Sequence, residues 1–132
     1  MKQTNAATGP GEPSCKDGDH APAARPSADP AALDRAARLF RAMGDGPRLR
    51  ILDYLAHGEC CVTELVSTLG EKFPTVSQRL RVLRSEGLVA RRRVGTHVYY
   101  ALADRHVAHL VANALAHAGE LEGSETDPDP ED

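Results

Sequence analysis

The 132-residue sequence contains no apolar run approaching the roughly 20 residues that a helix needs to cross a bilayer. Residues 1–30 also lack the apolar centre of a secretory signal peptide. Cysteine is scarce, and Cys15, Cys60 and Cys61 are an odd number of thiols in a chain without an export signal. We therefore expect a soluble, cytoplasmic protein that binds no membrane and has no disulfide framework. In that setting metal or redox chemistry suits the thiols better.

The sequence also lacks an overall positive charge, since its net charge is −3, and that average argues against a nucleic-acid partner. The average is misleading, because residues 119–132 hold seven of the 19 acidic side chains and none of the 16 basic ones. The rest of the chain has a net charge of +4, and seven basic residues between Lys72 and His97 face only Glu86. Local clusters of this kind release counterions from phosphates. The pattern therefore favours a DNA-binding surface over an ordinary solvated helix face.

Composition divides the chain into three segments. Residues 1–30 contain five prolines and three glycines and few large apolar residues, which predicts a disordered N-terminal arm. Within this arm, the stretch CKDGDH brings four potential metal ligands together: Cys15, Asp17, Asp19 and His20. Residues 31–119 are long enough for one folded domain. Residues 120–132 are acidic, contain two prolines and predict a disordered tail.

Apolar residues at helical spacing predict five helices in the folded domain. The first begins at Asp29-Pro30, carries Leu33, Ala36, Ala37 and Phe40, and ends at Gly44; the second runs from Pro47 to His57. The third runs from Cys61 to Leu69, the fourth is built on Val76, Leu80 and Leu83 and ends at Gly87, and the last runs from Asp104 to about Ala118. The turn between the third and fourth helices is short, and the fourth is polar on its outer side. Such a pair is typical of a helix-turn-helix, whose second helix enters the major groove.

Two extended runs follow the fourth helix, Leu88 to Arg93 and His97 to Leu102, joined through Val94-Gly95-Thr96. A polar-faced helix followed by a basic hairpin predicts a mainly α protein with a small β-hairpin, a winged helix-turn-helix that reads double-stranded DNA. We expect Thr75, Gln78 and Arg79 to contact base edges, with Ser77 beside them. We expect Arg81, Arg84, Arg92 and Arg93 to contact phosphates.

The last predicted helix carries four plausible ligands for a divalent metal ion: Asp104, His106, His117 and Glu120. His106 and His117 are 11 residues apart, so they share a helix face but stand about 16 Å apart along its axis. One helix therefore cannot bring both to one ion. If two copies pack antiparallel about a two-fold axis, Asp104 and His106 of one chain meet His117 and Glu120 of the other. The symmetry then produces the same site twice. Histidines and acids placed by chance on an exposed helix are the alternative.

Residues from about Leu33 to Glu120 resemble the ArsR/SmtB family of metal-responsive repressors, and most closely its SmtB-type zinc sensors. The resemblance lies in ECCVTEL from Glu59, TVSQRLRVLRSEGLV from Thr75, GTHVYYAL from Gly95, and DRH followed by HAGE. It implies a winged-helix homodimer that binds operator DNA without metal and releases it on binding zinc, or Co²⁺, Ni²⁺ or Cd²⁺. The family's pattern Asp-x-His, ten residues, then His-x-x-Glu matches Asp104, His106, His117 and Glu120.

The resemblance also implies a second metal site near the third helix. Cys61 matches its commonest cysteine and Glu64 a nearby acid, while Cys15 and His20 are candidates from the arm. The family usually shows Cys-x-Cys, whereas Cys60 and Cys61 are adjacent here and, on a helix, would point about 100° apart. Two alternatives follow: a sensor of arsenite, cadmium or oxidants that responds through these cysteines, and a small zinc hydrolase. Four ligands closing a site between helices leave no open position for catalysis, so we expect no enzyme and no small-molecule substrate.

Overall fold

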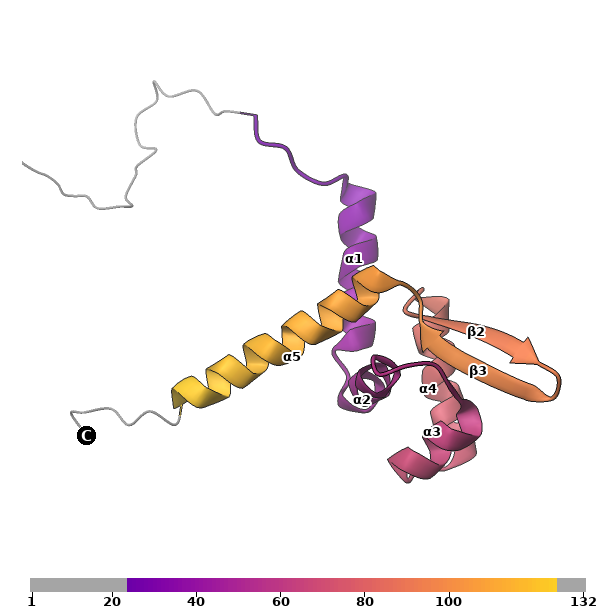
Figure 1. The fold of residues 1–132 in the computed structure, drawn as a ribbon. Coiled ribbons are helices and arrows are strands. Elements are labelled where there is room, and N and C mark those ends of the chain that lie inside the picture. The colour runs from indigo at the N-terminus through magenta and orange to yellow at the C-terminus, as the bar shows by residue number, and fades with distance from the viewer. Residues whose placement is uncertain (1–23, 126–132) are drawn as a thin grey trace, which may run out of the picture.

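The computed structural model describes residues 24–125, which form five helices and a three-stranded antiparallel sheet (Figure 1). The elements follow in the order α1 (Pro30–Met43), α2 (Gly46–Leu55), β1 (Cys60–Cys61), α3 (Val62–Leu69), α4 (Phe73–Ser85), β2 (Val89–Val94), β3 (His97–Leu102) and α5 (Arg105–Glu125). This order confirms the predicted helices and hairpin and adds one short strand. Cys15 and His20 of the N-terminal arm lie outside the described residues.

Helix boundaries follow local sequence signals. Pro30 lies in the first turn of α1, where a missing N–H costs little, and the carboxylate of Asp45 accepts a hydrogen bond from the backbone N–H of Arg48 at the start of α2 (3.1 Å). Gly70, with φ of 68°, ends α3 in the left-handed conformation that glycine adopts without strain. At the start of α4, Lys72 occupies the cap position and makes no side-chain cap bond.

The core lies where α2, α3, α4, the sheet and the first turns of α5 meet (Figure 1). Its largest fully buried side chains come from α2, α3, α4, the residue before β2, and α5, and are Ile51, Leu52, Leu65, Val76, Leu80, Leu83, Leu88 and Val111. They include Val76, Leu80 and Leu83, the three residues of α4 that were predicted to face the core. No buried polar or charged side chain occurs among residues 24–121, so apolar packing alone positions α4.

The sheet has the order β1-β3-β2, with β3 in the centre. The β2–β3 hairpin pairs Val94 with His97, and Gly95 takes up the turn with φ of 63°. On the other edge, Cys60 pairs with Tyr100 and Cys61 with Tyr99. The prediction that helix begins at Cys61 is therefore wrong by one residue. Adjacent residues of a strand point to opposite faces, so the two thiols diverge more than they would on a helix.

Helix α5 begins as predicted and ends later than predicted. Asp104 caps it, because its carboxylate accepts a hydrogen bond from the backbone N–H of Val107 (3.1 Å). The helix then continues to Glu125, so the predicted end near Ala118 is wrong and Glu120 is a helical residue. Only the first turns pack on the core, through Val107 and Val111, and the remainder projects away from the other elements (Figure 1).

Large apolar side chains remain exposed on α1 and α5. Leu33 and Phe40 on α1 are 56% and 60% exposed, and Leu115 and Leu121 on α5 are 41% and 54% exposed. The helical repeat on α1 therefore does not face the core of its own chain. Grouped apolar residues of this kind are typical of an interface with another molecule. Across residues 24–125, no helix combines the length and the hydropathy needed to span a bilayer.

A pair of substitutions on α3 tests this assignment of the core. Leu65→Ala removes a fully buried side chain, and we expect the free energy of unfolding to fall by about 2 to 5 kcal/mol. Ser67→Ala, on the exposed side of the same helix, is the matched control and should change it by less than about 0.5 kcal/mol. Urea denaturation followed by circular dichroism measures both. Equal effects of the two changes would contradict the assignment.

Candidate functional site

Helix α4 separates an apolar face from a polar one. Val76, Leu80 and Leu83 are fully buried, so α4 has a fixed orientation on the core. Gln78, Arg81 and Arg84 are exposed on the other side, while the three remaining predicted contacts, Thr75, Ser77 and Arg79, are half-buried. The helix therefore presents hydrogen-bonding groups and positive charge on a rigid support, as base readout requires.

Three of the predicted α4 contacts, Gln78, Arg79 and Arg81, interact with neighbouring side chains. The Arg81 guanidinium donates a hydrogen bond to Oε1 of Gln78 one turn earlier (2.8 Å), which leaves the Gln78 amide nitrogen free to donate outward. Arg79 forms an ion pair with Glu71 in the preceding turn (3.3 Å). Arg84 lines a hollow of about 460 Å³ together with Arg81 and Ser85. The polar face of α4 is thus partly ordered before any ligand binds.

The arginines of β2 divide between the two faces of the sheet. Arg91 and Arg93 alternate with Arg92, and Arg91 pairs with Tyr100, whose side chain is buried in the core. On the opposite face, Arg92 donates two hydrogen bonds to the Glu59 carboxylate (2.6 and 2.8 Å) and lies over the Tyr99 ring, 5.3 Å from its centre. The pairing with Arg92 lowers the pKa of Glu59 and raises that of Arg92. Glu59 could not be identified from the sequence as the partner of Arg92, since 33 residues separate the two.

The four candidate metal ligands on the last helix form two pairs. Nδ1 of His106 lies 3.7 Å from a carboxylate oxygen of Asp104, and Nδ1 of His117 lies 3.8 Å from a carboxylate oxygen of Glu120. All four side chains are more than half exposed, so their donor atoms face solvent. In the single chain no three His, Cys, Asp or Glu residues within the described part come together as a metal site. Each pair consists of one imidazole and one carboxylate.

The second candidate site is more divided. Cys60 is buried in the core, and burial raises the pKa of its thiol to about 11, whereas Cys61 on the other sheet face is half-buried. Glu64 accepts a short hydrogen bond from the Tyr54 hydroxyl (2.6 Å), which raises the pKa of Tyr54. Of the predicted ligands for this site within the described residues, only Cys61 is therefore both accessible and without a hydrogen bond to another side chain.

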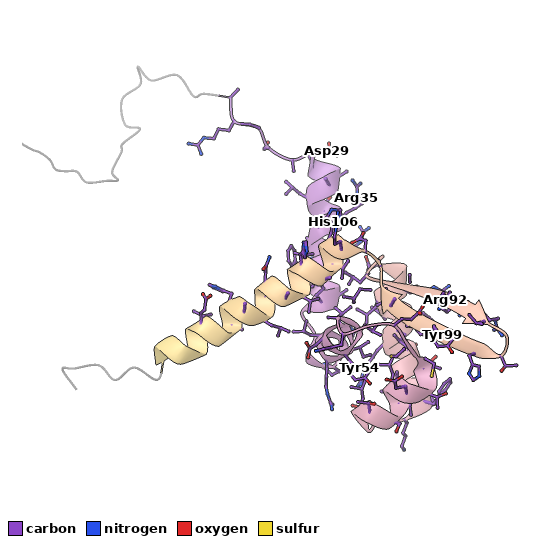
Figure 2. All side chains as sticks on the ribbon, in the orientation of Figure 1. Asp29, Arg35, Tyr54, Arg92, Tyr99 and His106 are labelled. Carbon is purple, nitrogen blue, oxygen red and sulfur yellow. The ribbon has the colours of Figure 1, made fainter. Side chains whose placement is uncertain are left out.

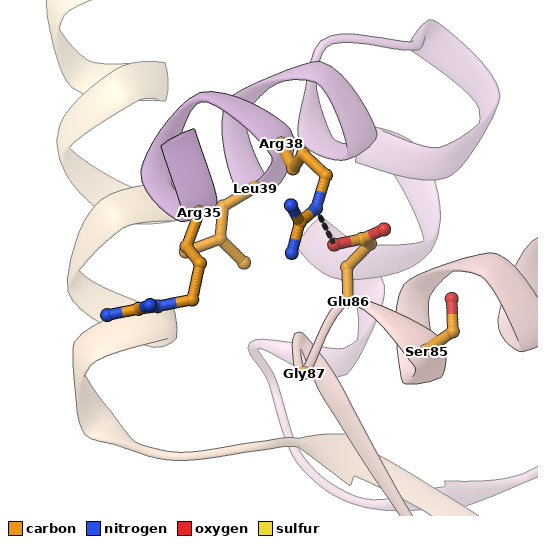
Figure 3. A pocket seen from close by; sticks show the side chains of 6 residues that line it. All are labelled: Arg35, Arg38, Leu39, Ser85, Glu86 and Gly87. Atoms are coloured by element: carbon orange, nitrogen blue, oxygen red, sulfur yellow. Dashed lines mark ion pairs between the residues drawn. The ribbon is translucent and has the colours of Figure 1, made fainter. Parts of the chain in front are cut away.

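A cavity of about 370 Å³ lies between α1 and the end of α4 (Figure 3). Arg35, Arg38 and Leu39 of α1 line one side, and Ser85, Glu86 and Gly87 line the other. Arg38 spans it with an ion pair to Glu86 (3.6 Å), while the Arg35 side chain extends away from Glu86 (Figure 3). The pair fixes α1 to the end of α4 at a partly exposed position, where such pairs add little stability.

Comparison with known proteins identifies the class. The model of the arsR family of bacterial regulatory proteins matches residues 45–91, which cover α2 to the start of β2. The HTH-type transcriptional repressor SmtB of Mycobacterium tuberculosis is 46% identical over 88 residues, which are 67% of this chain and 65% of that protein. The SmtB homolog of Synechocystis is 44% identical over 91 residues, which are 67% of this chain and 69% of that protein.

A solved structure supports the same assignment. The homodimeric winged helix-turn-helix DNA-binding domain of Mycobacterium bovis, described as a possible ArsR-family transcriptional regulator, superimposes with a TM-score of 0.66. It is 43% identical and covers 68% of this chain and 83% of its own. The fold and the polar-faced α4 therefore define a winged helix-turn-helix protein, which confirms the predicted fold class. The chain belongs to the arsR family of bacterial regulatory proteins, and its match spans about two thirds of the length of the mycobacterial repressor.

The raised pKa of Cys60 gives a direct test of its chemistry. In a Cys15→Ser, Cys61→Ser variant, Cys60 is the remaining thiol, and we expect slow alkylation by iodoacetamide at pH 7.5, rising as the pH approaches about 11. The thiolate is the reacting form, and burial disfavours it, so the rate should follow the raised pKa. Mass spectrometry measures the rate, and the same variant in urea is the control. Equal rates in the folded and unfolded protein would show that Cys60 is accessible and ionises normally.

Proposed function

We propose that this protein is a metal-sensing transcriptional repressor: a homodimer that binds operator DNA without metal and is released when zinc or a similar divalent ion binds. The observation that carries the proposal is the presence of two exposed His–carboxylate pairs, one at the start of α5 and one near its end. Together they would make up a set of four ligands. Membership of a family of bacterial regulators supports the DNA-binding part. A regulator of this kind acts on DNA in the cytoplasm.

Dimer formation is supported by what the chain leaves uncovered. Two exposed apolar residues, Leu33 and Phe40, lie on α1, and two others, Leu115 and Leu121, lie on α5. None of them is on α4, the reading helix, which would enter the major groove. Covering such side chains removes apolar surface from water, which stabilises the complex by about 25 cal/mol for each Å² of apolar surface buried. The M. bovis relative is a homodimer, and a two-fold axis that pairs α5 with its copy in antiparallel fashion would bring each first pair to the partner's second pair.

The ligand chemistry fits zinc. Two imidazole nitrogens and two carboxylates suit a tetrahedral site for a borderline divalent ion, and Co²⁺, Ni²⁺ and Cd²⁺ accept overlapping ligands. Asp104 has a second role, because it also caps α5 through the Val107 N–H. Metal binding at Asp104 would therefore act directly on the start of α5. Two residues separate this helix from the β2–β3 hairpin, which is the wing of the fold.

The switch then works through geometry. Two reading helices must lie about 34 Å apart to enter successive major grooves on one face of DNA. Each reading helix α4 is connected to α5 through the shared core, because Val107 and Val111 belong to the same buried cluster as residues of α2 and α4. An ion that binds more tightly to a dimer whose reading helices are misplaced weakens DNA binding. The ion then lowers the affinity for DNA by the same factor by which DNA lowers the affinity for the ion. A coupling free energy of about 1 to 3 kcal/mol is typical.

A thiol sensor on the same fold is the second candidate. Its supporting observation is Cys61, which is half-buried at the start of α3 beside the sheet. Cys60 supports it poorly, since a buried thiol with a raised pKa is a weak nucleophile and a weak metal ligand at neutral pH. The zinc hydrolase gains no support, because a set of four protein ligands leaves no open coordination position and the relatives are transcriptional regulators.

Substitution of a single ligand tests the metal part. His117→Ala should leave metal-free DNA binding unchanged and abolish release by zinc, because it removes one nitrogen from each shared site. His109→Ala, on the same helix but outside the proposed ligand set, is the matched control and should still be released. Fluorescence anisotropy of labelled operator, titrated with zinc, measures both. A His117→Ala protein released at wild-type zinc concentrations would contradict this site.

Substitutions on α4 test the DNA part. Gln78→Ala should cost about 1 to 3 kcal/mol of discrimination between operator and unrelated DNA, because an amide that hydrogen-bonds a base edge carries sequence information. Arg84→Ala should instead weaken binding to both DNAs and reduce the slope of log K against log salt by about 0.9, as expected for one lost phosphate contact. Salt-dependent binding titrations with two DNA sequences separate the two effects. The roles are misassigned if both variants lose affinity without losing specificity.

A further inference from the structure

Arg92 differs from the other arginines of the wing in its surroundings. Its guanidinium donates two hydrogen bonds to Glu59, just before β1, and lies over the ring of Tyr99 on the central strand β3 (Figure 2). The side chain therefore reaches from one edge strand of the sheet across the central strand to the other edge. Arg91 and Arg93 lie on the opposite sheet face, which contacts the core at Tyr100 and Val89.

We infer that Arg92 is a positioning residue that fixes the wing to the start of β1 through Glu59, and that it does not contact DNA phosphate. The inference rests on the proposed DNA-binding function, and it corrects the role that the sequence suggested for Arg92. Arg92, its hydrogen-bond partner Glu59 and the Tyr99 ring form a group of three residues, which we call the wing strap.

The geometry favours the strap over a phosphate contact for three reasons. A bidentate guanidinium–carboxylate pair is planar and directional, so it fixes both partners. The Tyr99 ring adds a cation–π contact that a phosphate contact would sacrifice. Finally, Arg92 points from the sheet face opposite the one that packs on the core, whereas Arg93 lies on the core side of the sheet and pairs with Val98.

The wing strap acts on β2, which contributes few buried side chains. Beyond Val89 all residues of β2 are exposed, and Val94 at the hairpin end is 47% exposed, so the outer part of the wing has no core of its own. A two-stranded hairpin is at best marginally stable by itself. A contact from β2 to the far side of the sheet thus limits how far the wing can twist or open.

The first experiment compares two neighbouring arginines by the salt dependence of operator binding. Arg93→Gln should reduce the slope of log K against log salt by about 0.9, since it removes a phosphate contact. Arg92→Gln should leave that slope at the wild-type value while weakening binding, because a loosened wing docks less well without changing the number of phosphates neutralised. A slope reduced equally by both substitutions would overturn the inference.

The second experiment tests the pair itself. Glu59→Gln should weaken binding as Arg92→Gln does, and the double variant should be no weaker than either single variant, because all three lose the same contact. The charge swap Glu59→Arg, Arg92→Glu restores the pair with the charges exchanged and should recover most of the affinity. If Arg92 contacts DNA, the swap places a carboxylate at a phosphate and binding falls further, which would overturn the strap.

Amide hydrogen exchange of the free, metal-free protein separates this inference from the proposed function. Arg92→Gln and Glu59→Gln should both speed exchange in β2 and β3 while leaving α2 and α4 protected, and the charge swap should restore the wild-type rates. Arg93→Gln is the matched control and should leave exchange unchanged. Unchanged exchange in all variants would overturn the strap, whereas faster exchange in a protein that never binds operator would keep the strap and reject the proposed function.

Discussion

The outer part of α5 is the feature on which the proposed regulation depends. Within residues 24–125, this helix buries only its first turns, at Val107 and Val111, and then extends away from every other element. An isolated helix of this kind gains little from propensity alone and is stabilised by packing. Burial of its exposed Leu115 and Leu121 requires a partner surface, and a second copy would offer one that carries the other proposed pair of ligands. The packing that favours a dimer would then also bring the proposed metal ligands together.

The reading surface depends on a different constraint, the depth at which α4 is buried. Three fully buried side chains fix the rotation of α4 about its own axis, and this rotation decides which residues face DNA. Val111 of α5 belongs to the same core as Leu80 and Leu83 of α4. Because close-packed interiors transmit displacement rather than absorb it, a shift of α5 can reach α4 without any contact between metal and DNA.

Much of this arrangement could be predicted from the sequence. Apolar spacing and the helix-ending glycines located the helices, and Gly95 located the hairpin turn, since these signals act over a few residues. The start of α3 was misplaced at Cys61, because the pairing of Cys60 and Cys61 with β3 joins residues about 40 positions apart. For the same reason Glu59 could not be assigned as the partner of Arg92. The proximity of His106 to Asp104 and of His117 to Glu120 could be predicted because each pair is local in the sequence. Whether the two pairs bind one ion depends on a second chain and stays a prediction.

The ion pairs also change how the charge of the reading surface should be understood. The sequence places seven basic residues around α4 and the wing, but Arg79 is paired with Glu71 and Arg92 with Glu59. Fewer cations are then free for phosphates than the count suggests, and each contact removed lowers the salt-dependent part of the affinity. This restraint suits a switch. A coupling free energy of about 1 to 3 kcal/mol can release an operator that is bound with moderate affinity. A surface on which every arginine contacted a phosphate would bind DNA too tightly to be released by the same coupling free energy.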